Sequence, residues 1–254
     1  MSIKKQIKTA SEKYQQYKPY LRKANFLAAN LLVFWLPLYK EYLPHVIVFW
    51  IFTWLIEGDF ITKFKSNFYG NKKLIFILSI LYYCLHVAGL IYTTNLSYGL
   101  YDLEFKLSLL IFPCIFISSN YLYKKHFKYL LYSFVGGTLI ASVICLVNAV
   151  FNSIGYINGD LVFNFSVFSD TRHYSFFKLL QNGWSYFSYS HLSIFHNPTY
   201  FSYYLLFALS IILFLPNFEQ KQKLIRKITK HAIILLLFIL IVLTSSRSGL
   251  ISVF

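Results

Sequence analysis

An arginine flanked by serines near the carboxyl end of the sequence has the residue types of an anion-binding site. Arg247 follows Ser246 and precedes Ser248, within the stretch Thr-Ser-Ser-Arg-Ser-Gly at residues 244–249. The planar guanidinium of arginine can form two parallel hydrogen bonds with a phosphate or pyrophosphate, and serine hydroxyls add further donors. A simpler interpretation is equally open, in which Arg247 extends to the aqueous edge of a membrane helix and binds no ligand.

A second group of polar residues surrounds the predicted start of an apolar helix at Pro198. Proline is favoured at the first position of a helix, so Asn197 precedes this helix and His196 lies beside its amino-terminal end. An imidazole at that place could transfer a proton or hydrogen-bond an anionic headgroup, and Tyr200 is a further candidate ligand residue. Alternatively, the segment is only a helix-capping loop with aromatic residues at the membrane surface.

The third candidate is His86, which lies within an apolar stretch. A single histidine in a membrane helix more often joins two helices by a hydrogen bond than it takes part in catalysis. Glu57 and Asp59 follow another apolar stretch, where we expect a solvated turn. The sequence contains no Gly-rich phosphate loop and no HExxH, CxxC or GxSxG motif, and we expect neither a metal nor a cofactor.

These residues belong to a chain whose composition is that of a membrane protein. Hydrophobic residues make up 57% of the 254 positions and charged residues only 13%, whereas a soluble domain carries about 25% charged residues. The formal net charge is +15, but the basic residues form short clusters between apolar stretches. This pattern is typical of cationic loops at the cytoplasmic surface of a membrane, so we expect a lipid bilayer as the partner and no nucleic acid.

Apolar stretches long enough to approach the width of a bilayer recur along the chain. Nineteen of the 24 Lys and Arg residues lie in four segments that face the cytoplasm if the amino terminus does, as the positive-inside rule requires. The sequence therefore predicts an all-α, polytopic transmembrane helical bundle of about seven spans and the start of an eighth. The four cytoplasmic segments are residues 1–23, 58–73, 120–128 and 217–230. The predicted spans are residues 24–39, 43–56, 74–92, 105–119, 129–151, 199–215 and 231–243, with the eighth beginning near Gly249.

We divide the chain into a basic cytoplasmic amino-terminal segment, residues 1–23, and a transmembrane domain, residues 24–254. The longest extracytoplasmic loop, at about residues 152–197, combines many aromatic residues with polar ones. It could anchor at the lipid headgroups or stack on sugar rings, and anchoring is the interpretation we favour. Because the last apolar stretch is too short to cross a bilayer before Phe254, we expect the sequence to be the front part of a longer protein.

Four stretches of the sequence resemble the amino-terminal half of O-antigen ligase-like membrane proteins. This family contains O-antigen ligases, O-antigen polymerases and related enzymes that join glycans. The Thr-Ser-Ser-Arg-Ser-Gly stretch is the most specific of the four signals. The resemblance covers the whole chain loosely and these segments well: residues 86–95, 103–113, 196–202 and 243–250.

The resemblance implies an inverting, metal-independent glycosyltransferase in the bacterial inner membrane, with a cytoplasmic amino terminus. Its donor would be a glycan linked to undecaprenyl pyrophosphate, its acceptor lipid A-core or another glycan, and transfer would occur at the periplasmic face. The resemblance also implies that an arginine in the position of Arg247 helps to hold the donor pyrophosphate. The catalytic residues are unknown, since the base usual in the family would lie beyond residue 254. We therefore expect the residues present here to be inactive alone.

Three other functions remain open at this point, and one of them is a non-catalytic membrane scaffold, which would leave Arg247 free to vary. The protein could be an O-antigen polymerase and not a ligase, since the choice of acceptor would lie in the second half of the family's chain. In another class, it could be a transporter of a lipid-linked or anionic solute. Such a protein is expected to carry paired charges at mid-bilayer and broken helices in repeated halves, and the sequence shows neither.

Overall fold

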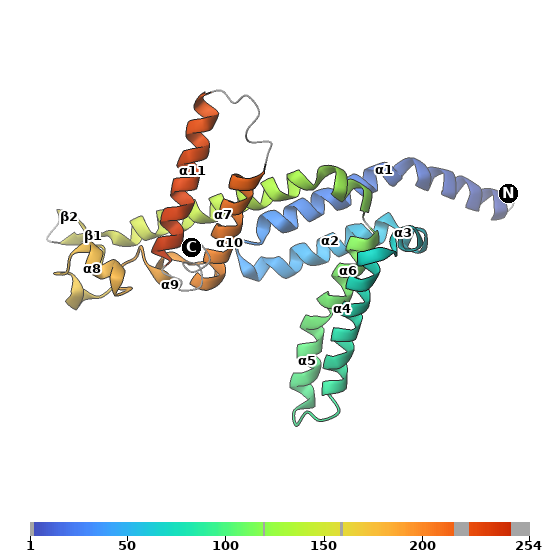
Figure 1. Ribbon diagram of the computed structural model, residues 1–254, viewed down its shortest axis with the longest axis horizontal. Helices are drawn as coiled ribbons and strands as arrows, with labels where there is room; N and C mark the ends of the chain where they lie inside the picture. The colour runs from blue at the N-terminus through green and yellow to red at the C-terminus, as the bar shows by residue number, and fades with distance from the viewer. Residues whose placement is uncertain (1–2, 119, 158–159, 216–223, 245–254) are drawn as a thin grey trace. The chain divides into compact units, whose positions relative to one another are not determined.

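The computed structural model describes residues 3–118, 120–157, 160–215 and 224–244, and these residues are mostly helical (Figure 1). Contacts between residues divide the chain into two compact units, and each is described by itself. Unit 1 comprises the described residues of 1–28 and 48–127, and unit 2 those of 29–47 and 128–254. Three helices contribute residues to both units: α1 (Ile3–Trp35), α2 (Leu43–Glu57) and α7 (Asn120–Ser153).

Unit 1 contains four further helices. They are α3 (Phe60–Asn67), α4 (Gly70–Gly89), α5 (Leu96–Lys106) and α6 (Ser108–Ser118). Helix α4 packs against α5 and α6, and α3 packs against α6. The indole of Trp50 is buried between α1, α2 and α7, where its Nε1 donates a hydrogen bond to Tyr123 Oη at 3.0 Å. Tyr123 Oη in turn donates to Asn25 Oδ1 at 2.8 Å, so hydrogen bonds join the three shared helices within unit 1.

Unit 2 contains several shorter elements besides its parts of α1, α2 and α7. The strands β1 (Ile154–Ile157) and β2 (Asp160–Phe163) form an antiparallel pair in which Ile154 lies opposite Phe163. The 3₁₀ helices are η1 (Lys40–Tyr42) and η2 (Ser169–Thr171), and the remaining α-helices are α8 (Phe176–Gln181), α9 (Tyr189–Leu192), α10 (Pro198–Phe214) and α11 (Leu224–Leu243).

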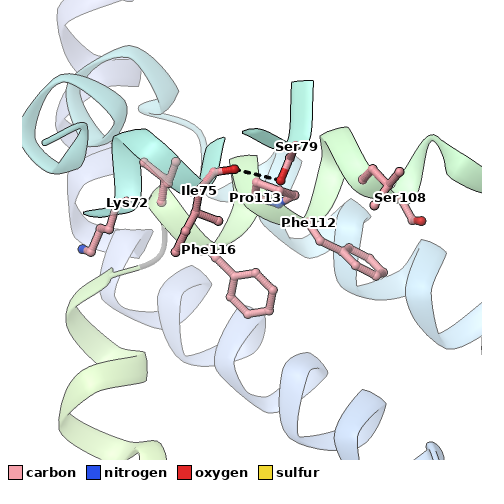
Figure 2. Close-up of a pocket in the computed structure, with 9 residues that line it drawn as sticks. Lys72, Ile75, Ser79, Ser108, Phe112, Pro113 and Phe116 are labelled. Atoms are coloured by element: carbon pink, nitrogen blue, oxygen red, sulfur yellow. Dashed lines mark hydrogen bonds between the residues drawn. The ribbon is translucent and has the colours of Figure 1, made fainter. Parts of the chain in front are cut away.

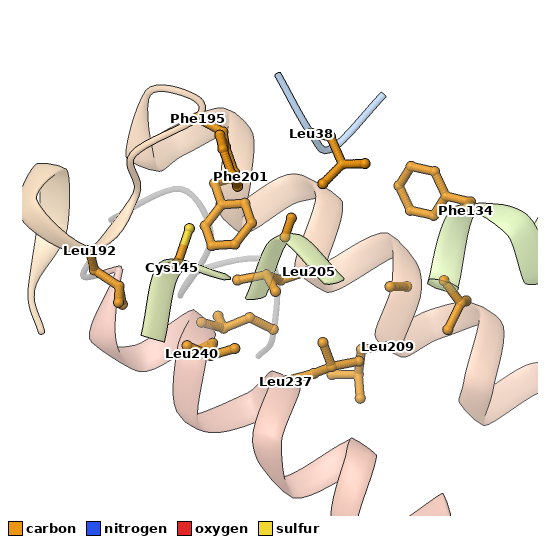
Figure 3. Close-up of a cluster of buried hydrophobic side chains, with 14 of the residues drawn as sticks. Leu38, Phe134, Cys145, Leu192, Phe195, Phe201, Leu205, Leu209, Leu237 and Leu240 are labelled. Carbon is orange, nitrogen blue, oxygen red and sulfur yellow. The ribbon is translucent and has the colours of Figure 1, made fainter. Parts of the chain in front are cut away.

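The core of unit 2 forms where α7, α10 and α11 meet (Figure 3). Leu205 and Leu209 of α10 pack with Leu237 and Leu240 of α11, and Cys145 of α7 is fully buried beside them. The end of α1 also packs closely against α7. A methyl group added at Gly137 would lie 2.0 Å from the backbone oxygen of Phe34, so only glycine allows the two helices to approach this closely.

The predicted bundle of about seven spans is wrong. Among the described residues, only Gly70–Gly89 and Tyr123–Ser153 are helices long and apolar enough to cross a membrane. The segments predicted as spans at residues 43–56 and 199–215 form helices of 15 and 17 residues. At about 1.5 Å per residue, both are shorter than the roughly 30 Å of a hydrocarbon core. The β1–β2 pair is also a departure from the all-α prediction.

Errors in two predicted helix boundaries explain much of the difference between the predicted and the observed spans. The predicted first span is not a separate helix, because α1 runs for 33 residues from Ile3 through Pro19 and ends at Trp35. The predicted fourth span, residues 105–119, is divided, since α5 ends at Lys106 and α6 is only 11 residues long. Hydropathy identified apolar stretches correctly, but it did not indicate where each helix begins and ends.

Candidate functional site

The start of α10 in unit 2 is built as the sequence predicts. Pro198 occupies the first position of the helix, and Asn197 caps it: Asn197 Oδ1 accepts a hydrogen bond of 3.0 Å from the backbone N of Thr199. Upstream, Ser193 Oγ donates to the backbone oxygen of His196 at 2.7 Å. These two bonds fix the backbone on both sides of His196, so its imidazole has a defined position beside the amino-terminal end of the helix.

The imidazole of His196 lies in a largely apolar setting. Its ring meets the ring of Tyr204 edge-on, with centroids 5.2 Å apart. Burial lowers the pKa of His196, and Lys40 acts in the same direction, whereas the backbone oxygens of Leu38 and Leu36 partly oppose them. Nε2 is buried and has no hydrogen-bond partner among the residues that the structure describes. A neutral imidazole with one open nitrogen can accept a proton or donate a hydrogen bond to a ligand.

The end of α11 lies at the same end of the core as the start of α10. The two helices run antiparallel, and the second half of α11 packs against α10 (Figure 1). Leu192 and Phe195, which precede α10, belong to the same buried cluster as Leu240 and Ile241 near the end of α11. Thr244 follows α11, is fully buried, and donates its hydroxyl to the backbone oxygen of Ile241 at 2.7 Å. Thr244 is the first residue of the Thr-Ser-Ser-Arg-Ser-Gly stretch.

The predicted site residues fall into three groups. His196 and Tyr200 are both at the start of α10, where the ring of Tyr200 is exposed. His86 belongs to unit 1. Ser246, Arg247 and Ser248 lie outside the described residues, as does Gly249, where the eighth span was predicted to begin.

His86 joins α4 to α5. Lys106 Nζ, at the end of α5, lies 3.1 Å from His86 Nδ1 and also forms an ion pair with Asp102 one turn earlier. A protonated lysine has no acceptor, so Nδ1 of His86 accepts this hydrogen bond and the neutral ring carries its proton on Nε2. The i, i+4 spacing of Asp102 and Lys106 is visible in the sequence, but their meeting with His86 depends on the turn between α4 and α5.

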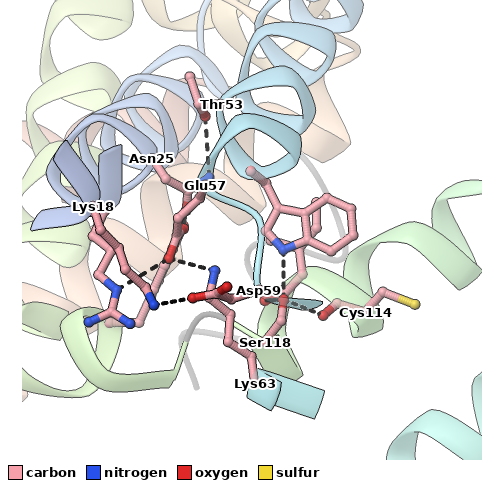
Figure 4. A network of polar contacts seen from close by, with 12 residues as sticks. Lys18, Asn25, Thr53, Glu57, Asp59, Lys63, Cys114 and Ser118 are labelled. Atoms are coloured by element: carbon pink, nitrogen blue, oxygen red, sulfur yellow. Dashed lines mark hydrogen bonds and ion pairs between the residues drawn. The ribbon is translucent and has the colours of Figure 1, made fainter. Parts of the chain in front are cut away.

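The solvated turn expected at Glu57 and Asp59 is wrong (Figure 4). Glu57 is buried, and its Oε1 lies 2.7 Å from Lys63 Nζ and 3.6 Å from Arg22 Nε. Lys18 forms an ion pair with Asp59. Lys18 and Arg22 reach the α2–α3 connection from α1, a helix that begins at Ile3. The sequence prediction described residues 1–23 only as a basic cytoplasmic segment and assigned no helix there.

Among the described residues, no three His, Cys, Asp or Glu side chains are grouped as metal ligands would be. The chemistry available at the start of α10 is therefore that of imidazole, hydroxyl and backbone groups. Comparison of the chain with protein-family models, with curated proteins and with solved structures finds no match.

Proposed function

We propose that this chain belongs to a membrane glycosyltransferase similar to the O-antigen ligases. The full-length protein would transfer a glycan from undecaprenyl pyrophosphate to lipid A-core or another glycan acceptor at the periplasmic face of the bacterial inner membrane. Arg247, with Ser246 and Ser248, would bind the donor pyrophosphate. The four sequence stretches that resemble the family are the basis for naming this reaction.

The observation that carries the proposal is the pairing of α10 with α11. Two of the four stretches, residues 196–202 and 243–250, are separated by 40 residues or more in the sequence. The antiparallel helices bring the beginning of one stretch and the beginning of the other to one end of a shared core. A single ligand at that end would therefore lie close to both His196 and Thr244.

The chemistry of this end of unit 2 suits a pyrophosphate-linked donor. The amino-terminal end of α10 carries the positive end of the helix dipole, which favours an anion. Pyrophosphate is already a good leaving group, so cleavage of its bond to the sugar requires no general acid. Arginine would instead stabilise the charge that develops on the leaving oxygen. The neutral imidazole of His196 could donate a hydrogen bond to the donor without adding a second buried charge.

Location in a membrane has support independent of the reaction. Helix α4 is 20 residues long, and none of its residues is buried inside the protein, so its apolar surface requires a lipid or protein covering. The second candidate span, Tyr123–Ser153, belongs to α7. Basic residues lie at the start of both: Lys72 and Lys73 in α4, and Lys124 and Lys125 in the Tyr123–Ser153 segment. We propose that both helices enter the bilayer from the cytoplasm, in keeping with the positive-inside rule, and that α5 and α6 together return the chain to the cytoplasmic side between them.

A transporter of a lipid-linked or anionic solute is the less favoured function. The buried charges of Glu57 and Lys63 flank the α2–α3 connection, and the pair of Lys106 and Asp102 lies in the last turn of α5. Ion pairs at the ends of helices stabilise connections between elements and do not form the mid-bilayer site that a transporter needs. A polymerase would use the same donor site as a ligase and differs only in its acceptor.

The proposal is tested by incubating the purified full-length protein with a glycan on undecaprenyl pyrophosphate and with lipid A-core. We expect the glycan to move to the acceptor and undecaprenyl pyrophosphate to be released. If donor glycan in place of lipid A-core serves as acceptor, the protein is a polymerase of the same chemistry. A folded full-length protein that releases no undecaprenyl pyrophosphate with either acceptor would contradict the proposed reaction.

A further inference from the structure

A groove between α4 and α6 in unit 1 has one charged end and apolar walls (Figure 2). It has a volume of about 420 Å³. Lys72, in the first turn of α4, lies at one end and Ser108, at the start of α6, lies at the other. The side chains between them are mainly apolar: Ile75, Leu109, Phe112, Pro113, Phe116 and Ile117.

The polar groups of the groove differ in whether they have hydrogen-bond partners within the protein. Ser79 Oγ donates to the backbone oxygen of Ile75 at 2.9 Å, and Ser108 Oγ donates to that of Phe105 at 3.0 Å. Both hydroxyls therefore use their protons within their own helix turns. Lys72 Nζ is buried, and the described residues provide it with no hydrogen-bond acceptor and no carboxylate. Nζ of Lys72 lies over the face of the Tyr69 ring, 6.0 Å from its centroid.

The surroundings of Lys72 add positive charge and no negative charge. Lys124 is close enough to act electrostatically on Lys72. The first turn of α4 contains no acidic residue, and Tyr69 at the capping position makes no side-chain cap. The positive end of the helix dipole therefore adds to the field of the two lysines. An anion with several oxygen atoms would satisfy the buried ammonium group.

We propose that this groove binds an anionic phospholipid, with the phosphate at Lys72 and an acyl chain along Ile75, Phe112 and Phe116. One amphiphile accounts for both features, because a soluble anion would leave the apolar walls uncovered and an uncharged lipid would leave the ammonium group unpaired. The proposal depends on the proposed membrane insertion of α4 but on no glycan chemistry. With the orientation proposed above, the lipid comes from the cytoplasmic leaflet, which is the anionic one.

The lipid is tested by native mass spectrometry of the purified chain in detergent, titrated with phosphatidylglycerol or phosphatidylcholine of identical acyl chains. We expect phosphatidylglycerol to bind about tenfold more tightly, because both lipids carry the phosphate but the choline ammonium of phosphatidylcholine is repelled by Lys72 and Lys124. Lys72→Gln should abolish this preference and Lys72→Arg should keep it. The matched control is Lys73→Gln: Lys73 is the next residue and is exposed, but it does not line the groove. The proposal would be overturned if Lys72→Gln and Lys73→Gln lost the preference for phosphatidylglycerol equally. It would also be overturned if the wild type showed no preference between the two lipids.

A second measurement locates the acyl chain. Phosphatidylglycerol with a photoreactive group on its acyl chain should label peptides that contain Ile75 and Phe112, and Lys72→Gln should reduce this label. Inorganic phosphate at the same concentration should not displace the lipid, because it cannot fill the apolar groove. Labelling confined to other helices, or displacement by phosphate alone, would contradict binding in the groove. Because the assay contains no glycan, failure of the lipid site is distinguishable from failure of the proposed transfer reaction.

Discussion

Lys63 Nζ lies 2.7 Å from Oε1 of Glu57 in unit 1, and both side chains are buried. Glu57 ends α2 and Lys63 lies in α3, while Arg22 of α1 approaches the same carboxylate oxygen at 3.6 Å. The backbone oxygen of Glu57 also accepts a hydrogen bond from Tyr14 of α1. One residue therefore joins three helices, and its carboxylate compensates the buried positive charge of Lys63.

We expect Glu57→Ala to destabilise the protein by about 3–5 kcal/mol, because it leaves Lys63 without its buried partner. The measurement is the free energy of unfolding of the purified chain in detergent. Asp102→Ala is the control, since the Asp102–Lys106 pair is partly exposed and such pairs contribute about 0–1 kcal/mol. Equal losses in the two variants would show that burial does not distinguish these ion pairs.

Neighbouring glycines in α7 should respond differently to the same substitution. In Gly137→Ala the new methyl group would lie 2.0 Å from the backbone oxygen of Phe34, so α1 and α7 must separate. We expect a loss of about 1–3 kcal/mol or more, as overpacking produces. In Gly136→Ala the nearest atom is 3.8 Å away, in the Phe34 ring, and alanine is favoured over glycine in a helix by about 1 kcal/mol. The unfolding temperatures of the two variants should therefore shift in opposite directions or by clearly unequal amounts. Equal shifts would be evidence against the close approach of α1 and α7 at Gly137.

His196 should make the stability of the protein depend on pH. Burial lowers its pKa in the folded state, whereas the unfolded chain binds a proton near the usual value of about 6.5. The unfolded state then binds more protons between the two pKa values, so stability is complete above about pH 6.5 and falls as the pH decreases through the folded-state pKa. The free energy of unfolding, measured between pH 7.5 and 5.5, should decrease less steeply with falling pH in His196→Gln than in the wild type. An identical pH dependence would contradict a buried, neutral imidazole.

The proposed orientation predicts the location of two segments. Reporter fusions within residues 63–73 should be cytoplasmic, because four lysines lie there, two in α3 and two in the first turn of α4. Fusions within residues 160–190, after the candidate span Tyr123–Ser153, should be extracytoplasmic. Compartment-specific enzyme reporters distinguish the two sides. The opposite pattern would place the start of α10 and the end of α11 away from the periplasmic substrates that the proposed reaction requires.

Local features of this fold could be predicted from the sequence. The Asn-Pro pair correctly indicated the start of α10, and continuous hydropathy identified α4 as long enough to span. Helix lengths could not be predicted as well from the sequence. The division between α5 and α6 at residues 106–108 and the extension of α1 through Pro19 depend on packing between helices. The burial of Glu57 was also missed. Its partner Arg22 is 35 positions away, and no local pattern connects them.

Only part of the candidate site could be predicted in the same way. The residue types at positions 196–202 and 244–249 indicated anion-binding chemistry, but the placement of the start of α10 and of Thr244 at one end of the core depends on the antiparallel packing of α10 and α11. The groove at Lys72 gave no sequence signal beyond a basic cluster. Its character depends on which lysine has its ammonium nitrogen shielded from solvent, and Lys72 lines the groove against α6 whereas Lys73 does not.

The most direct measurement of the proposed function compares Arg247→Lys with the wild type in the purified full-length protein, using a lipid-pyrophosphate donor. Lysine keeps the charge but loses the planar fork, and removal of one such charge-stabilising contact costs about 2.7–4 kcal/mol, or roughly a hundred- to a thousandfold in rate. We predict this loss for Arg247→Lys and Arg247→Ala at normal membrane abundance, and a mild effect for Lys178→Ala, whose ammonium group packs 4.0 Å from the centroid of the Tyr174 ring. Wild-type transfer by both Arg247 variants would contradict the assignment of the donor pyrophosphate to this residue.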